Sequence, residues 1–164
     1  MLRRRMQLWR LLQRYELYKG DEVMESRTFT SENGLELIIK SRKSAVILEM
    51  EQSKTNEEYH FTFEFNLTGF MELLEYLEVV SNKSWNAFNP RECDSLGADY
   101  YEYYDRPLDN NGCLNISNCK LKIERPSLES GRLYQFNKKK MESFIYDFKK
   151  IIALIKNTDK MRIN

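Results

Sequence analysis

Polar and apolar residues alternate most regularly in residues 58–66, EYHFTFEFN. Polar residues occupy every second position, and aromatic residues stand between them. The aromatic residues are Tyr59, Phe61, Phe63 and Phe65. Successive side chains of a strand point to opposite faces of a sheet, so this alternation predicts a strand with one buried face and one solvated face.

Four other short runs are rich in strand-forming residues and are bounded by turn residues. Residues 35–40 (LELIIK) follow the turn sequence ENG, and the linker SRKS separates them from residues 45–51 (AVILEME), so these two runs predict a hairpin. Leu121 and Ile123 alternate with polar residues ahead of Pro126. Residues 131–136 (GRLYQF) form the last predicted strand.

Two segments instead repeat apolar residues at the spacing of a helix. The first predicts a helix over residues 69–81, with Asn66 or Thr68 as its N-cap. The second follows Asn137 and carries a longer apolar stripe with lysines opposite: Met141, Phe144, Ile145, Phe148, Ile151, Ile152 and Ile155.

The order of these elements is three strands, a helix, two strands and a helix, without the regular alternation of a parallel sheet. It predicts an α+β fold, in which two amphipathic helices pack on one face of an antiparallel sheet of about five strands. The chain has 164 residues and is 41% hydrophobic, which suffices for one core. We therefore expect residues 24–164 to form a single domain.

Residues 1–23 differ from the rest of the chain in charge. They carry six Lys/Arg and three acids, whereas the remaining residues have a net charge of −2. Their apolar residues have helical spacing, which predicts a basic amphipathic helix. Residues 19–21 (KGD) can be encoded AAA-GGA-GAT, which contains the bacterial ribosome-binding run AAGGAG shortly before Met24. We expect residues 1–23 to be translated leader; a helix packed on the domain and a membrane or nucleic-acid arm are the alternatives.

Cysteine usage and hydropathy bear on the compartment. The three cysteines are an odd number without paired spacing, which argues against a disulfide framework and favours a reducing compartment. No window approaches the ~18 uncharged apolar residues that a membrane span needs. We therefore expect a cytoplasmic protein.

Few residues in the chain are suited to catalysis. The one histidine, His60, lies on the polar side of its predicted strand, where a solvated side chain is the simplest expectation. The chain has no glycine-rich phosphate loop, and its cysteines lack the spacing of zinc ligands. We predict no catalytic residue, no metal site and no cofactor. An enzyme that uses His60 or a carboxylate pair in a deep pocket is the alternative.

Residues 91–111, RECDSLGADYYEYYDRPLDNN, form what we call the acidic tyrosine segment, with a net charge of −4. Tyrosine is enriched at interface hot spots, and carboxylates steer a basic partner. We therefore predict that this segment binds a protein with a basic surface, and that the contact residues are Asp94, Asp99, Tyr100, Tyr101, Glu102, Tyr103, Tyr104 and Asp105. The alternative is a plain surface loop with two tyrosines packed on the sheet. We expect the nearby Trp85 and Phe88 to lie in the core.

The C-terminal part of the chain is basic, with twelve Lys/Arg and five acids from residue 118 onward. Three lysines stand at the start of the last predicted helix, where the helix dipole disfavours positive charge: Lys138, Lys139 and Lys140. A nucleic-acid-binding or regulatory module that uses this helix is the main alternative function. Because most of the lysines fall opposite the apolar stripe, we favour a solvated face over a nucleic-acid site.

In layout and composition, residues 24–164 resemble the small immunity proteins that bacteria encode beside polymorphic or contact-dependent toxins. The shared features are two early strands, an FxFxF strand, a capped helix, a Trp and a closing amphipathic helix. The resemblance implies a non-enzymatic inhibitor that binds a cognate toxin one to one, without turnover. It also implies that the acids Asp99, Glu102 and Asp105 pair with Lys and Arg of the toxin, and that the tyrosines fill hollows on it.

Overall fold

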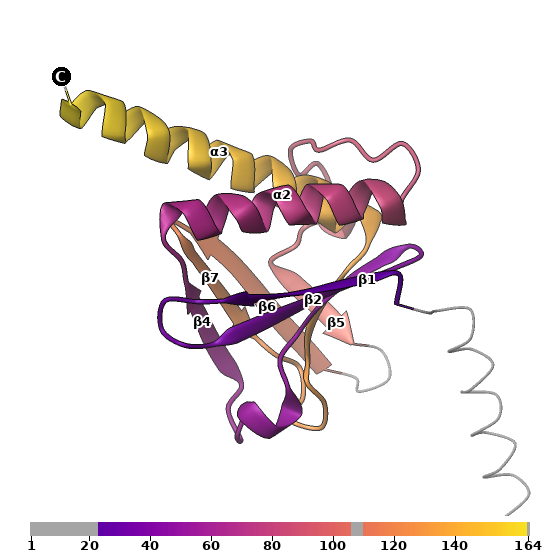
Figure 1. Cartoon of the computed structure of the whole chain (residues 1–164). Helices are drawn as coiled ribbons and strands as arrows, with labels where there is room; N and C mark the ends of the chain where they lie inside the picture. Colours follow the sequence, from indigo (N-terminus) through magenta and orange to yellow (C-terminus); the bar gives the residue numbers. More distant parts are fainter. Residues whose placement is uncertain (1–22, 106–109, 164) are drawn as a thin grey trace, which may run out of the picture.

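The computed structural model describes residues 23–105 and 110–163 of the chain. They form two antiparallel four-stranded sheets and two long helices, shown in Figure 1. The first sheet has the order β1 (Glu25–Thr30), β2 (Glu36–Arg42), β3 (Ala45–Glu49) and β8 (Arg132–Phe136). The second has the order β4 (His60–Glu64), β7 (Lys120–Glu124), β6 (Asn110–Ser117) and β5 (Glu102–Asp105). The helices are α2 (Leu67–Ser84) and α3 (Lys138–Ile163).

The predicted α+β class is confirmed, and all five predicted strands are present. Three further strands, β1, β5 and β6, raise the number to eight and divide them between two sheets. Both helices lie on the same side of the strands, as Figure 1 shows. Of the predicted leader, the described residues include only Val23, so the leader hypothesis lies outside them.

Both predicted helices are present, and each begins at an asparagine N-cap. The Asn66 side chain accepts a hydrogen bond from the backbone N–H of Gly69 (2.7 Å), which makes Asn66 the N-cap of α2. The Asn137 side chain accepts one from the N–H of Lys140 (2.8 Å) at the start of α3. These caps satisfy N–H groups that a helix end would otherwise leave unpaired.

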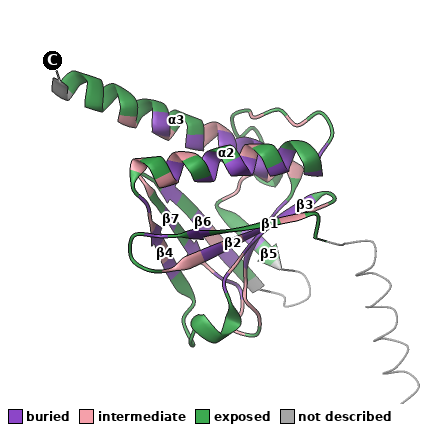
Figure 2. Ribbon diagram, viewed as in Figure 1, coloured by how far each residue is buried: buried purple, intermediate pink, exposed green. Residues whose placement is uncertain are grey.

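A hydrophobic core joins both sheets to both helices. The alternating phenylalanines of β4 are buried, and the rings of Phe70 in α2 and Phe148 in α3 lie 4.4 Å apart. Trp85 is buried in the core, as expected, and Phe88 is half-buried and packs against it, with ring centroids at 5.9 Å. Figure 2 shows that the buried positions of the helices face the strands, while much of the distal part of α3 is exposed.

Arg125 is a charged residue that lies fully inside this architecture. The Arg125 side chain is 1% exposed, and its guanidinium donates hydrogen bonds to three backbone carbonyls, those of Glu58 (2.7 Å), Ser130 (3.1 Å) and Asn56 (3.3 Å). Burial lowers the pKa of Arg125. The guanidinium thus joins the loop before β4 to the loop between β7 and β8.

Replacing Gly131 with alanine is expected to lower the free energy of unfolding by about 2 kcal/mol. A Cβ at this position would lie 2.2 Å from the carbonyl oxygen of Met50, so the backbone pairing of β3 with the start of β8 must shift. Chemical denaturation measures the loss. Gly97→Ala is the matched control, because the nearest atom to its Cβ is 4.0 Å away. Equal stabilities of the two variants would contradict the expected clash.

Candidate protein-binding site

The acidic tyrosine segment runs from a loop into the edge of the second sheet. Residues 85–101 connect α2 to β5, with one turn of 3-10 helix at η2 (Leu96–Ala98), and β5 continues the segment as an edge strand. The prediction of a long loop therefore holds for only part of the segment. Residues 106–109 lie outside the described residues, as does the Asp105 side chain, so the structure does not place that predicted contact.

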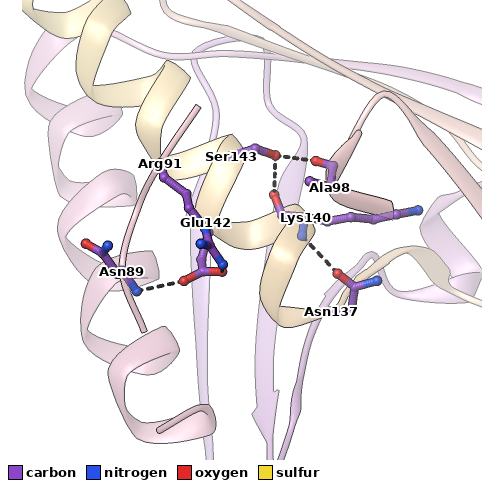
Figure 3. Close-up of polar contacts among 7 residues, drawn as sticks. All are labelled: Asn89, Arg91, Ala98, Asn137, Lys140, Glu142 and Ser143. Carbon is purple, nitrogen blue, oxygen red and sulfur yellow. Dashed lines mark hydrogen bonds and ion pairs between the residues drawn. The ribbon is translucent and has the colours of Figure 1, made fainter. Parts of the chain in front are cut away.

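The loop is held to the first turns of α3 by a buried carboxylate. The Glu142 side chain is 2% exposed and accepts a hydrogen bond from the backbone N–H of Asn89 (2.8 Å). It also lies 3.4 Å from the Arg91 guanidinium, and the Arg91 backbone N–H donates to the Glu142 carbonyl (3.3 Å). The hydroxyl of the next residue, Ser143, donates to the carbonyl of Ala98. Figure 3 shows these side chains and the loop backbone pointing toward one another.

Tyr100 continues this attachment and does not face outward. Its hydroxyl donates to Asp147 (2.7 Å) and its ring packs edge-on against Phe144 at 5.1 Å. The Tyr134 hydroxyl in turn donates to the carbonyl of Tyr100 (2.6 Å). Burial, followed by the interactions with Asp147, raises the pKa of Tyr100, and burial raises that of Tyr134. Residue 100 therefore fixes the segment and is not an exposed contact.

These two tyrosines are expected to make the folded state less stable at alkaline pH. Their pKa lies above the ordinary value of 10.0 in the folded chain, so the unfolded chain releases its protons first and binds fewer of them above pH 10. Their contribution is complete below pH 10 and is lost as the pH rises toward the folded-state pKa. Urea denaturation from about pH 9 to pH 11 should show the fall, and Tyr100→Phe should reduce its slope. An unchanged slope in that variant would contradict the assignment.

The contacts of Lys140 account for one of the three lysines at the start of α3, where the helix dipole disfavours positive charge. Its ammonium donates to the carbonyl of Glu102 (2.6 Å) in β5, and burial lowers the pKa of Lys140 while Asp99 and Glu102 oppose that change. Residues from about two turns of one helix thus hold the segment. They are Lys140, Glu142, Ser143 and Asp147. A loop fixed at this many points has little conformational freedom left to lose.

Several side chains of the segment remain on the surface. Tyr101 is 50% exposed and Tyr104 is 49% exposed, whereas Tyr103 is buried against Tyr134 with ring centroids at 5.2 Å. The structure therefore places two tyrosines inward and two outward. The surface-loop alternative predicted two tyrosines packed on the sheet; Tyr103 packs there, against Tyr134 of β8, whereas Tyr100 packs against α3. Of the predicted acids, Asp94 and Glu102 are exposed, and Asp99 is half-buried and accepts a hydrogen bond from the backbone N–H of Tyr101 (2.9 Å).

Sequence reasoning missed Leu96, the most exposed large apolar residue of this region. Its side chain is 93% exposed on η2, in the middle of the acidic residues Glu92, Asp94 and Asp99. A single leucine in a polar loop belongs to no periodic pattern, so nothing in the sequence marked it. A single exposed apolar residue is common on protein surfaces, so Leu96 adds apolar area to the segment but does not by itself mark an interface.

His60 and possible metal ligands are the other candidates for a functional site. The His60 side chain is 78% exposed on β4 and lies 3.9 Å from Glu124, as expected for a solvated strand residue. Within residues 23–105 and 110–163, no group of three or more His, Cys, Asp and Glu side chains is arranged to hold a metal ion. A shallow hollow of about 430 Å³ beside the loop is lined by Asn89, Pro90, Tyr146, Lys149 and Lys150, and His60 does not reach it.

None of the helices in the described part of the chain combines the length and apolar character that crossing a bilayer requires. Comparison of the sequence and structure with known protein families, curated proteins and solved structures gave no match.

Proposed function

We propose that this chain is a non-enzymatic inhibitor that binds a cognate protein one to one, and that the partner is a toxin with a basic surface. The observation that carries the proposal is the anchored loop of residues 85–101 with the edge strand that follows it. This region holds exposed tyrosines, an exposed leucine and exposed carboxylates on a backbone fixed to α3.

The chemistry of this surface favours a protein partner. Leu96, Tyr101 and Tyr104 provide exposed apolar area, and Glu92, Asp94 and Glu102 of the same segment provide exposed negative charge. Protein interfaces commonly have aromatic or aliphatic anchors inside a polar rim. Because Tyr100 and Tyr103 are packed inside, the outward residues replace them as the expected contacts. A nucleic-acid backbone would be repelled by these acids.

The immunity-protein hypothesis rests on the resemblance in layout and on this surface. An immunity protein acts by occupying the active site or an essential surface of its toxin, so it needs a rigid complementary face and no catalytic group. The attachment of the acidic loop and β5 to α3 supports the proposal, because it fixes the backbone that would present such a face. We place this action in the cytoplasm, where the absence of disulfide bonds among Cys93, Cys113 and Cys119 is the usual state of cysteines.

The test is capture of the partner from the native cell lysate with the whole chain as bait. A second bait carries Tyr101→Ala and Tyr104→Ala, which remove exposed side chains and leave the anchored Tyr100 in place. A third carries Tyr59→Ala, a matched control because Tyr59 is 41% exposed in a different part of the chain. We expect one stoichiometric protein with the first and third baits and its loss with the second. The captured protein is then titrated with the chain, and its toxic activity should disappear at one equivalent.

Three results would contradict the proposal. Capture of the same protein by all three baits would show that the segment is plain surface. Recovery of nucleic acid with strong salt dependence would favour the basic helix as the functional surface. Binding without loss of the partner's activity would show that a complex forms but would contradict the inhibitor function.

A further inference from the structure

The turn between β1 and β2 lies against β4, an edge strand of the second sheet (Figure 1). The backbone N–H of Glu32 donates to the carbonyl of Glu64 (2.6 Å). The Asn33 side chain donates from its amide nitrogen to the carbonyl of Thr62 (2.7 Å), and its oxygen accepts from the backbone N–H of Glu64 (3.3 Å). Because a side-chain amide carries the same kinds of donor and acceptor as a peptide group, Asn33 stands in for a strand residue at this edge.

Further hydrogen bonds hold the turn in this shape. The Ser31 hydroxyl belongs to a buried residue and donates to the Asn33 side-chain oxygen (2.6 Å). The backbone N–H of Gly34 donates to the carbonyl of Ser31 (3.1 Å), and Gly34 has φ +86°, a conformation that favours glycine. The Asn66 side chain at the start of α2 donates to the Glu32 carboxylate (2.9 Å). We call these contacts of residues 31–34 the turn clamp.

Asn33 is followed by a glycine, and asparagine in this setting is chemically labile. The backbone nitrogen of Gly34 can attack Cγ of the Asn33 side chain. Its proton passes to the side-chain nitrogen, which leaves as ammonia, and a succinimide ring remains. Water then adds to either of the two ring carbonyls and opens the ring, which leaves a carboxylate and a proton. The product is aspartate or isoaspartate at position 33.

The turn clamp keeps the reacting atoms apart while it is closed. The Gly34 N–H is bonded to the Ser31 carbonyl, and both ends of the Asn33 amide are bonded to β4. The ring can therefore close only after the turn opens. Asn33 and Gly34 are both exposed, so opening need not disturb the core. Local opening of an exposed turn needs less free energy than unfolding of the chain.

The chain has a second Asn-Gly pair in a different setting, Asn111-Gly112. Both residues belong to β6, where they pair with Tyr104 and Tyr103 of β5. Gly112 is also crowded, since a Cβ on it would lie 2.7 Å from the carbonyl oxygen of Glu124. In an extended strand, successive side chains point away from each other's backbone, which holds the glycine nitrogen away from the asparagine Cγ. The structure thus favours reaction in the turn over reaction in the strand.

The product cannot remake the turn clamp. An ionised carboxylate has no donor, so it cannot bind the carbonyl of Thr62 as the Asn33 amide does. It also adds negative charge next to two acidic residues, Glu32 and Glu64. Isoaspartate in addition lengthens the main chain of the turn. The backbone groups of β4 at residues 62 and 64 then lose the partners that the turn provides.

We propose that Asn33 is a site of deamidation by water, that the turn clamp controls its rate, and that the reaction releases the turn from β4 irreversibly. This site is separate from the acidic tyrosine segment and does not depend on the inhibitor function.

The first test follows the reaction in the folded full chain. The protein is incubated at mildly alkaline pH in isotopically labelled water, and its peptides are mapped by mass spectrometry. We expect residue 33 to take up labelled oxygen and to appear as both aspartate and isoaspartate, while Asn111 stays intact. In urea, where neither turn nor strand remains, both asparagines should convert at similar rates, and faster than Asn33 does in the folded chain.

A variant of the turn tests the control by the clamp. Ser31→Ala removes the hydroxyl that binds the Asn33 side chain and is expected to raise the rate at Asn33 about five- to tenfold. Asn111 should stay intact in this variant, which shows that the chain remains folded. Ser26→Ala is the matched control, because Ser26 is an exposed serine on β1, and it should leave the rate unchanged.

A second variant tests the release of the turn. Asn33→Asp has the side chain of the aspartate product, so hydrogen exchange at the amides of Glu32 and Glu64 should be about tenfold faster than in the parent chain. Asn115→Asp is the matched control, since it makes the same charge change at an exposed asparagine of β6, and it should leave those amides unchanged.

Several outcomes would overturn the proposal. Conversion of Asn111 before Asn33 in the folded chain would place the reactive site in the strand. Absence of conversion at Asn33 in both the folded parent chain and Ser31→Ala would remove the site. Equal rates in these two chains would mean that the clamp does not control the reaction. Unchanged exchange in Asn33→Asp would mean that conversion does not release the turn.

Discussion

Replacing Arg125 with methionine is expected to lower the free energy of unfolding by about 3 kcal/mol, the largest stability effect we predict for a single side chain. The substitution keeps much of the volume but removes the donors that bind the carbonyls of Glu58, Ser130 and Asn56. Carbonyls left in a buried place without a donor are unfavourable because they have also lost water. For a chain of this size the melting temperature should fall by roughly 6 to 12 °C.

Thermal and urea denaturation provide the measurement for Arg125→Met. Arg27→Met is the matched control, because the Arg27 side chain is 48% exposed and its contact with Glu72 is 3.7 Å long. Exposed pairs of this kind contribute at most about 1 kcal/mol. If the two variants lost the same stability, the buried guanidinium would not hold the two loops together.

The second large effect is expected at Glu142. Glu142→Ala should lower the free energy of unfolding by about 2 kcal/mol, since hydrogen bonds to a charged group are stronger than neutral ones. It should also weaken binding of the captured partner by about a hundredfold, although Glu142 is 2% exposed and cannot contact it. The reason is that Asn89 and Arg91 lose their anchor, so binding must then order the loop.

Hydrogen exchange tests this prediction without the partner. Amides of residues 86–98 should exchange faster in Glu142→Ala, while those of β2 and β3 should keep their protection. Glu72→Ala is the control, an exposed glutamate on the other helix whose removal should change neither quantity. Unchanged exchange in the loop would mean that the Ser143 and Tyr100 contacts suffice to hold it.

The elements with strong periodicity could be predicted from the sequence. The FxFxF strand, the hairpin of β2 and β3, and both helices have apolar residues on one face, and two asparagines cap the helices. These features depend on neighbours within a few positions, so a local pattern contains them. The missed β1 buries only Phe29 among its six residues, and such a strand has no alternation to detect.

The parts that could not be predicted depend on contacts between distant residues. β5 is a strand because it pairs with β6, and the tyrosines of the segment divide into inward and outward pairs because Tyr134 and Phe144 lie beside it. Neither helical nor strand spacing alone gives that division, since the chain changes from loop to strand at residue 102. In the same way, nothing near Arg125 in the sequence shows that three carbonyls from two loops meet there.

The position of β5 at the edge of its sheet has a consequence for solubility. An edge strand presents backbone groups that can pair with a strand of another molecule, and charged side chains on the edge oppose such pairing. Glu102 is exposed there, and Lys140 occupies its carbonyl. The exposed carboxylates of this region are therefore expected to oppose edge-to-edge pairing of two copies of the chain. Neutralising them is expected to promote aggregation through β5, whatever it does to partner binding.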